Sequence, residues 1–235
     1  MTQADLSAEW FAKMASVDTP TICNALELAR GERSVLGYTR GTPVAAPRPL
    51  PAFVGYARTL RYSAAAPGGL APAEARAMRL AYYRYIEPKG TPVVVVMQDI
   101  DDTPGLGSFW GEVNSNIHQA LGVRGVLTNG SVRDLDVLAP GLPIIAGSVG
   151  PSHGFSNVVD FDKPVTVFGL AVKPGDLIHA DRHGAAIIPP ELADRMPHCI
   201  DVCVAREKPV LDATRKPGFS VADIEKAFGE ADDIH

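Results

Sequence analysis

The sequence predicts an α/β fold, in which a single domain is built in layers around a mixed β-sheet. Predicted strands and helices alternate through the middle of the chain, and strand-rich segments flank that region. Residues 91–100 contain the run Val-Val-Val-Val-Met, which is apolar on both faces, as expected of a central strand covered on both sides. The chain shows no internal repeat, low-complexity tract or interdomain linker, so one layered domain is expected over residues 1–235.

The N-terminal part predicts two helices followed by strand structure. Residues 5–15 place apolar side chains at helical spacing. Asp18, followed by a threonine and a proline, is a typical helix start, and this second helix should end near Gly31. Four prolines interrupt residues 37–52, which predicts a loop or an edge strand. Residues 53–63 alternate in polarity and predict a strand.

The middle of the chain predicts a βαβαβ pattern that is preceded by one more helix. The expected elements are helix 72–86, strand 91–100, helix 112–121, strand 122–130, helix 131–138 and strand 142–150. This order is typical of a sheet with parallel strands and helical crossovers.

The C-terminal part changes character. Residues 157–190 predict short strands separated by Lys-Pro turns, and the last two form a hairpin within residues 176–189. Residues 191–206 predict a helix that Pro197 kinks or restarts, and residues 221–228 predict a last helix.

Composition excludes several classes of protein. The chain has 22 basic and 27 acidic residues without a dense block of Lys or Arg, which argues against a nucleic-acid partner. No apolar run reaches the roughly 18 residues of a membrane span, and the first residues lack a signal-peptide core. Cys23, Cys199 and Cys203 are odd in number and form no CxxC motif, so no disulfide framework is expected. We therefore expect a cytoplasmic protein without a membrane partner.

The first candidate site is the glycine-rich segment before the helix at residues 112–121. Gly107 and Gly111 flank the helix start, where unpaired N–H groups and the positive end of the helix dipole favour an anion. An ordinary glycine-rich turn is the alternative interpretation. The glycine spacing is not GxGxxG, so a dinucleotide site is not indicated.

The second candidate site follows the next predicted strand. Arg133 and Asp134 are expected to open the helix at residues 131–138. Arginine offers two parallel donors to a carboxylate, and the neighbouring aspartate offers a hard oxygen ligand to Mg²⁺ or Mn²⁺. A 2-oxo acid presents groups that match both. Alternatively, the two residues are solvated charges or partners of each other.

These motifs resemble those of class II 4-hydroxy-4-methyl-2-oxoglutarate aldolases and the related RraA-like proteins. The resemblance rests on Gly111-Glu112-Val113 and on Asn129-Gly130-Ser131-Val132-Arg133-Asp134, with further similarity in Val17–Leu28 and Gly169–Pro189. It implies a layered α/β sandwich of the swivelling-domain type, with a core at about residues 18–195 and a helical extension at 196–235. It also implies homotrimers or homohexamers with active sites between subunits.

The resemblance also implies roles for individual residues. Arg133 would bind the substrate carboxylate and Asp134 would be the direct protein ligand of a divalent cation. Gly111 and the backbone amides of Val113 and Asn114 would help to hold the oxo acid, while Glu112 would hydrogen-bond a water on the metal. Arg133 and Glu112 are thus the expected catalytic residues.

Some positions depart from the family pattern or stay open. Asn114 stands where the family usually has leucine, which predicts a more polar wall. His153, Asp181 and His183 are candidate pocket residues, and His179 and His183 are expected on one strand face; a hydrogen-bonded hairpin beside the site is the alternative. An acidic residue contributed by a neighbouring subunit is not assigned; the candidates are Glu207, Asp212 and Glu225.

The function that the resemblance implies is a metal-dependent lyase. It would cleave 4-hydroxy-2-oxo acids by a retro-aldol reaction that releases pyruvate, with oxaloacetate decarboxylation as a side activity. No lysine is needed for such chemistry, unlike that of Schiff-base aldolases. The alternative is a non-catalytic RraA-like protein that binds and regulates an RNA-degrading endonuclease.

Overall fold

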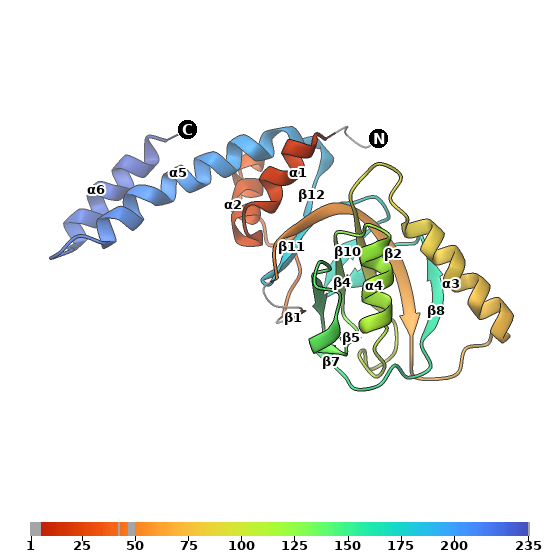
Figure 1. The fold of residues 1–235 in the computed structure, drawn as a ribbon. Coiled ribbons are helices and arrows are strands. Elements are labelled where there is room, and N and C mark those ends of the chain that lie inside the picture. Colours follow the sequence, from red (N-terminus) through yellow and green to blue (C-terminus); the bar gives the residue numbers. More distant parts are fainter. Residues whose placement is uncertain (1–5, 42, 47–49, 235) are drawn as a thin grey trace.

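A mixed β-sheet organises the protein (Figure 1). The structure, a computed structural model, describes residues 6–41, 43–46 and 50–234. The helices are α1 (Ala8–Ala15), α2 (Thr19–Arg30), α3 (Pro72–Ile86), α4 (Glu112–Ala120), α5 (Met196–Thr214) and α6 (Val221–Asp232), with 3-10 turns η1 (Leu135–Val137) and η2 (Pro190–Arg195). The strands are β1 (Val44–Ala46), β2 (Phe53–Ser63), β3 (Val93–Asp99), β4 (Gly125–Thr128), β5 (Ser131–Val132), β6 (Ile144–Ala146), β7 (Ser148–Val149), β8 (Asn157–Phe161), β9 (Val165–Val167), β10 (Leu170–Val172), β11 (Leu177–Asp181) and β12 (Gly184–Ile188).

The large sheet has a parallel centre and antiparallel edges. Its strand order is β1-β6-β4-β3-β2-β11-β12, and β8 also pairs with β2. Strands β2, β3, β4 and β6 run parallel, whereas β1, β8, β11 and β12 pair antiparallel. β2 is long enough to pair with β11 near its start and with β8 near its end. The predicted α/β fold with a mixed sheet is therefore confirmed.

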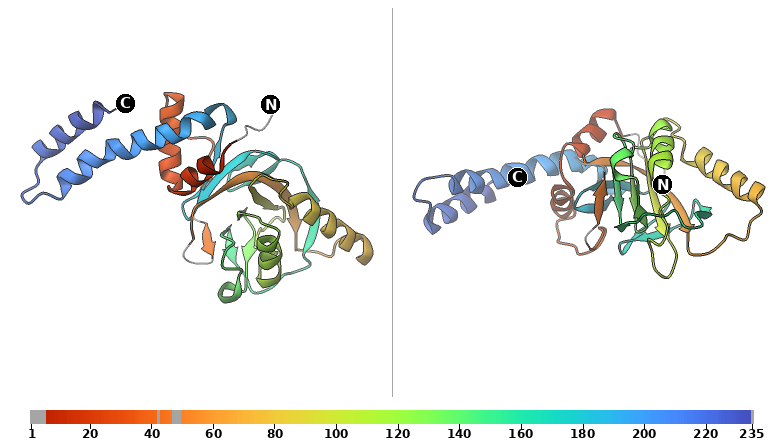
Figure 2. Two further views of the ribbon diagram at one scale, coloured as in Figure 1. Left: turned by 45° about the horizontal axis from the view of Figure 1, so that its top comes forward. Right: turned by 60° about the horizontal axis from the view of Figure 1, so that its bottom comes forward.

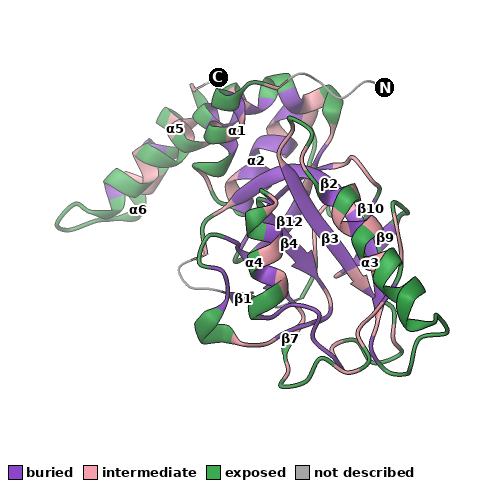
Figure 3. Ribbon diagram, turned by 45° about the vertical axis from the view of Figure 1, so that its right-hand side comes forward, coloured by how far each residue is buried: buried purple, intermediate pink, exposed green. Residues whose placement is uncertain are grey.

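The run of valines in β3 divides the core between the two faces of the sheet. Val93, Val95 and Met97 pack in a cluster that includes side chains of α3. Val94 and Val96 pack in a second cluster with the β9–β10 hairpin. Every one of these five side chains is fully buried, because the sheet is covered on both sides (Figure 3).

A third apolar cluster joins the N-terminal helices to the β11–β12 hairpin. It contains Met14 of α1, Ile22 of α2, Ile188 of β12 and Ile200 of α5. The predicted start and end of α2 are confirmed: Asp18 Oδ1 accepts the N–H of Thr21 at 2.9 Å, and the helix ends at Gly31 with φ 77°. Glycine adopts this left-handed conformation without a steric cost.

Two predictions are wrong. Residues 131–138 do not form a helix: Ser131 and Val132 form β5, which pairs with β7, and only the short turn η1 follows. Long-range strand pairing therefore overrides the local helical pattern. His179 lies in β11, but His183 lies in the turn after that strand, so the two histidines do not share a strand face.

The C-terminal helices form a projecting arm. η2 gives way to α5 at Met196, so the helix restarts one residue before Pro197, and it continues beyond Pro209. The far half of α5 pairs with α6, and both helices extend away from the sheet (Figure 2). Across the described residues, neither α5 nor any other helix is long and apolar enough to cross a membrane.

Candidate functional site

The two segments singled out by their sequence meet beyond the carboxyl ends of the parallel strands. Trp110 forms a parallel bridge with Val132, and the N–H of Arg133 donates to the carbonyl of Trp110 at 2.8 Å. This backbone contact places the start of α4 beside the residues that follow β5. Ligands of open α/β sheets bind at this edge of the sheet.

Gly111 allows an unusually close approach between the two segments. A Cβ atom at position 111 would lie 2.5 Å from Asp134 Oδ2 and 3.0 Å from Arg133 Cγ. The N–H of Glu112 donates to Asp134 Oδ2 at 3.1 Å, and Arg133 Nε lies 3.7 Å from the same oxygen. The backbone of Gly111 is extended, so the residue is needed for space rather than for a special conformation.

Asp134 adopts a left-handed backbone conformation, with φ 57° and ψ 42°. Non-glycine residues adopt this region at a cost, although aspartate tolerates it better than most. The conformation turns the carboxylate back towards Gly111 and Glu112. Strained residues of this kind gather at functional sites, which supports a role for Asp134.

The first turn of α4 offers two free backbone donors. Among the described residues, the N–H groups of Val113 and Asn114 have no acceptor, whereas the N–H of Ser115 donates to Gly111 at 2.9 Å. Glu112 is exposed, and its carboxylate has no partner in the described part of the chain. A carboxylate placed here would meet two amides and the positive end of a helix dipole.

The side chain of Asn114 supports the site from inside. Its Nδ2 donates to the carbonyl of Phe109 at 2.6 Å, and its Oδ1 accepts the hydroxyl of Tyr83 at 2.9 Å. The amide therefore ties α3 to the loop before α4 and does not present its polar atoms to the site. The predicted polar wall is corrected accordingly, and Tyr83 is a supporting residue that sequence reasoning missed.

His118 is a second supporting residue without a local sequence signal. It is fully buried on α4, where its Nδ1 lies 2.6 Å from the carbonyl of Asn114 and its Nε2 lies 2.8 Å from the hydroxyl of Tyr82. Nδ1–H donates to the carbonyl, so Nε2 accepts from the tyrosine. Burial lowers the pKa of His118 to about 4, which keeps the ring neutral.

Asp99 and Asn129 join the ends of β3 and β4. Asn129 Oδ1 accepts the N–H of Asp99 at 2.8 Å, and Asn129 Nδ2 donates to the carbonyl of Asp99 at 2.9 Å. The Asp99 carboxylate accepts the N–H groups of Asp101 and Gly105. Burial raises the pKa of Asp99, although these backbone donors oppose the change. The pair fixes the loops from which the site is built.

The other predicted pocket residues are divided between the two ends of the sheet. His153 is exposed on the same side as the site, since a Cβ at Gly107 would lie 2.6 Å from its carbonyl oxygen. Asp181 ends β11 and His183 follows it; this strand runs antiparallel to β2 and ends beside Phe53 at the opposite end of the sheet. Within one chain they are therefore separate from Arg133.

A divalent cation fits the chemistry of Asp134. Its side chain is 31% exposed, and its Oδ1 has no partner among the described residues. No group of three or more His, Cys, Asp or Glu side chains in the described ranges could hold a metal ion. A cation here would therefore have Asp134 as its protein ligand and take its other ligands from water and substrate, as Mg²⁺ commonly does.

The fold and the site together define a class: an α/β protein in which an arginine, an aspartate and free helix amides meet at the carboxyl edge of its sheet. The chain belongs to the RraA-like family (Aldolase/RraA), which matches residues 19–187. The predicted family is therefore confirmed.

Two curated relatives match parts of the chain. An uncharacterized protein of Methanocaldococcus jannaschii is 36% identical over 86 residues, which are 36% of this chain and 41% of that protein. Protein DlpA of Legionella pneumophila is 25% identical over 101 residues, which are 42% of this chain and 16% of DlpA. The chain thus spans less than half the length of either relative.

Solved structures share the fold. An uncharacterized protein of Pseudomonas syringae pv. tomato has a TM-score of 0.69 at 20% identity, covering 97% of this chain and 96% of that one. RraAS2 of Streptomyces coelicolor, described as an unusual member of the RNase ES inhibitor RraA family, has a TM-score of 0.65 at 22% identity, covering 90% and 98%. A protein described among novel cellulases of gut-associated microbes has a TM-score of 0.71 at 15% identity, covering 88% and 89%.

Proposed function

We propose that the protein is a divalent-metal-dependent lyase that cleaves 4-hydroxy-2-oxo acids and releases pyruvate. The observation that carries this proposal is the close approach at Gly111. It brings the Arg133 guanidinium, the Asp134 carboxylate and the free amides of α4 to one position. A 2-oxo acid offers a carboxylate to the donors and, with its keto oxygen, a chelating pair to a cation.

Arg133 binds and orients the substrate carboxylate in this proposal. Its side chain is 33% exposed, so it is accessible to a ligand. Paired N–H groups match the two oxygens of a carboxylate, and the amides of Val113 and Asn114 add donors from the side of α4. Together they fix the C1 end of the substrate.

Asp134 would hold the cation, which when bound supplies a Lewis acid for the charge that develops on the C2 oxygen. Removing the 4-hydroxyl proton and breaking the C3–C4 bond releases a carbonyl compound and leaves the enolate of pyruvate, which a proton then quenches at C3. Glu112 is the chain's group for moving the hydroxyl proton, because its carboxylate is exposed and unpaired in the described structure. Loss of CO₂ from oxaloacetate gives the same enolate, so decarboxylation is the expected side activity.

Pyruvate release tests the proposal. The purified protein should release pyruvate from 4-hydroxy-4-methyl-2-oxoglutarate and from oxaloacetate in the presence of Mg²⁺ or Mn²⁺. EDTA and Asp134→Ala should each abolish the release, while Glu32→Ala, which removes an exposed carboxylate from the loop after α2, should not. Activity that survives both EDTA and Asp134→Ala would refute the role of the metal.

Regulation of an endonuclease is the competing function. The likeness to RraAS2, a member of an RNase ES inhibitor family, favours it. A binding assay with such an endonuclease separates the two functions. Binding without any pyruvate release would replace the lyase proposal.

A further inference from the structure

A cavity opens between α3 and β8, and we call it the α3–β8 cavity. Its volume is about 490 Å³, and the helix and the strand lie side by side where it forms (Figure 1). Its walls come from the loop before α3, from α3 itself and from residues 156–159. The described lining includes none of residues 111–114 or 131–134, so this cavity is separate from the site around Arg133 and Asp134.

The loop that closes the α3–β8 cavity is held in place by hydrogen bonds. The Asp101 carboxylate accepts the N–H of Ala64 at 2.7 Å, and Asn157 Nδ2 donates to the carbonyl of Ala66 at 2.8 Å. A Cβ atom at Gly68 would collide with Asn157 Oδ1, so glycine lets the loop approach β8 closely. These contacts fix the distance between the two walls.

Arg79 is the one charged residue among the described residues that line the α3–β8 cavity. Its Nη2 donates to the carbonyl of Ser156 at 2.9 Å, and its guanidinium lies 5.9 Å from the centre of the Phe109 ring. A carbonyl and the face of an aromatic ring both attract a cation, so these contacts position the guanidinium. Its Nε and Nη1 have no acceptor in the described part of the chain, and no carboxylate there forms an ion pair with it.

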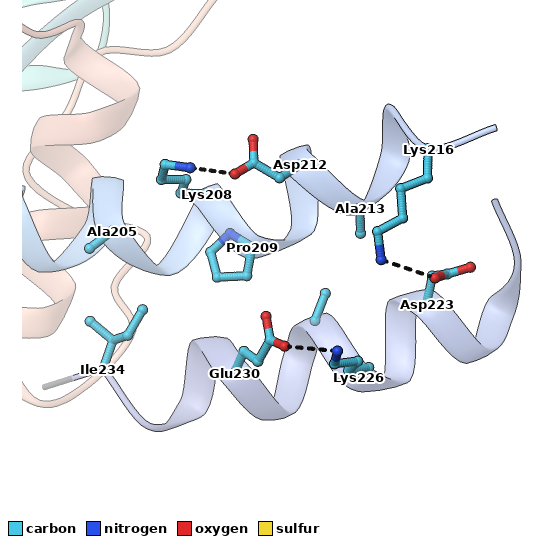
Figure 4. Close-up of a pocket in the computed structure, with 11 residues that line it drawn as sticks. Ala205, Lys208, Pro209, Asp212, Ala213, Lys216, Asp223, Lys226, Glu230 and Ile234 are labelled. Atoms are coloured by element: carbon cyan, nitrogen blue, oxygen red, sulfur yellow. Dashed lines mark hydrogen bonds and ion pairs between the residues drawn. The ribbon is translucent and has the colours of Figure 1, made fainter.

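The hollow between α5 and α6 is different, because each of its lysines already has an acidic partner. Figure 4 shows the pairs, which are Lys208–Asp212, Lys216–Asp223 and Lys226–Glu230. An anion in that hollow would compete with three carboxylates. An anion beside Arg79 would meet free N–H donors and no paired carboxylate.

Apolar side chains form much of the remaining wall of the α3–β8 cavity. Leu70 is 46% exposed and Val159 is 39% exposed, and Met78 of α3 is half-buried. Covering such side chains with an apolar ligand is favourable, and methionine adapts its shape to what it contacts. The volume lies in the range of sites for small organic molecules, roughly 300–1,000 Å³. An inorganic anion would leave most of this space and all of the apolar wall without a partner.

We propose that the α3–β8 cavity binds an aliphatic monocarboxylate of medium chain length. Its carboxylate bonds to Arg79, and its chain lies against Leu70, Met78 and Val159. One unpaired guanidinium matches a single carboxylate, and the apolar wall matches a chain that carries no further polar group. The proposal does not rest on the lyase reaction, and its test measures binding alone.

Calorimetric titration with octanoate tests the proposal. The folded wild-type protein should bind octanoate saturably, with one site per chain. Acetate lacks the chain and octanamide lacks the charge, so each should bind roughly tenfold more weakly or less. The affinity should rise roughly two- to fourfold with each CH₂ group from butanoate to octanoate. Inorganic phosphate should not displace octanoate.

Variants of the cavity wall locate the bound carboxylate. Arg79→Met should weaken octanoate binding roughly tenfold or more, because the charged donor is lost. Val159→Asp leaves Arg79 in place and adds a negative charge to the wall, so it should weaken binding to a similar extent. Arg76→Met, which removes an exposed arginine from the same helix, is the matched control and should bind octanoate as the wild type does. Circular dichroism should show that every variant is folded.

Arg133→Lys and Asp134→Ala should also bind octanoate normally, which separates this cavity from the proposed lyase site. Loss of binding in Arg133→Lys with full binding in Arg79→Met would place octanoate at that other site and overturn the proposal. Equal affinities for octanoate and acetate, or for octanoate and octanamide, would overturn it too. So would the absence of saturable binding to the wild type at millimolar octanoate.

Discussion

Asp181 and Asp134 lie at helix starts on opposite ends of the sheet. They differ in how many of their carboxylate oxygens accept hydrogen bonds. Asp181 accepts the N–H of Thr19 at the start of α2, and it also accepts the backbone N–H of His183 and pairs with that ring. Asp134 accepts the N–H of Glu112 at the start of α4, and one of its oxygens has no partner among the described residues. The Asp181 side chain is 7% exposed and that of Asp134 is 31% exposed.

The difference separates a cluster whose groups bond to one another from a cluster that keeps unpaired donors and acceptors. Burial acts to raise the pKa of Asp181, but hydrogen bonds from His183 and Thr19 outweigh it and lower that pKa. His179, in the same cluster, bonds to Thr19 and to the carbonyl of Met14. The polar groups of Thr19, His179 and Asp181 are thus used to hold the fold, whereas Arg133, Asp134 and the amides of α4 keep unpaired donors and acceptors.

The two regions contain glycines whose substitution should have opposite consequences. Gly111→Ala should reduce pyruvate release roughly 1,000-fold, because the new Cβ would displace Asp134 and Arg133. Its thermal midpoint should change little, since the new Cβ meets side-chain atoms and no backbone atom. Gly184→Ala should instead destabilise the fold by more than about 1 kcal/mol, because φ is 126° and the Cβ would collide with Thr39. Pyruvate-release kinetics and thermal unfolding should be measured for both variants. An equal loss of stability in Gly111→Ala and Gly184→Ala would contradict the prediction.

Arg133→Lys should lower kcat/KM roughly 100-fold. Lysine keeps the charge but loses the paired donors that match a carboxylate. Arg182→Lys, in the turn between β11 and β12, is the matched control and should leave kcat/KM unchanged. Steady-state kinetics with oxaloacetate provide the measurement. Wild-type kcat/KM in Arg133→Lys would show that the guanidinium does not bind the substrate carboxylate.

Each region also contains one fully buried histidine, and both should make the protein less stable in mild acid. Burial lowers the pKa of His118 to about 4 and lowers that of His179. Because the unfolded chain binds protons below about pH 6.5 and the folded rings do not, stability is full above that pH and falls towards pH 4. His118 alone should contribute a loss of about 2 kcal/mol between pH 7 and pH 5. Urea unfolding should show a shallower pH dependence in His118→Gln, and an unchanged slope would refute the assignment.

The smallest effect is expected from removal of the Tyr83 hydroxyl, which donates to Asn114. Tyr83→Phe removes one hydrogen bond and should lower the free energy of unfolding by about 1 kcal/mol. It should also raise KM more than it lowers kcat, because α4 is held less firmly while Arg133 is untouched. Tyr38→Phe is the control, since the Tyr38 hydroxyl has no partner among the described residues. Unaltered KM in Tyr83→Phe would show that the contact serves stability alone.

The sequence predicted best where a pattern depends on nearby residues. The valines of β3, the cap at Asp18 and the start of α4 at Glu112 were all expected and are present. The adjacency of Gly111 to Arg133 and Asp134 follows from parallel strands that end at one edge, and the structure places them together.

Features that depend on distant residues were missed. Residues 131–138 have a helical pattern, but pairing of β5 with β7 prevents the helix. The left-handed backbone of Asp134 was not expected, because residues 131–138 were predicted to be helical. The inward orientation of Asn114 depends on Tyr83, which lies 31 residues earlier in the chain.

The amide of Asn129 bears on how long the protein survives chemically. An asparagine before glycine ordinarily ages by deamidation, in which the following backbone nitrogen attacks the side-chain carbonyl carbon. Here both polar atoms of the Asn129 side chain are hydrogen-bonded to the backbone of Asp99. The backbone N–H of Gly130 donates to Thr128 Oγ1 at 3.0 Å. The attacking atom and its target are therefore held in other bonds, and the folded protein should keep this asparagine intact over storage times that convert it in the denatured chain.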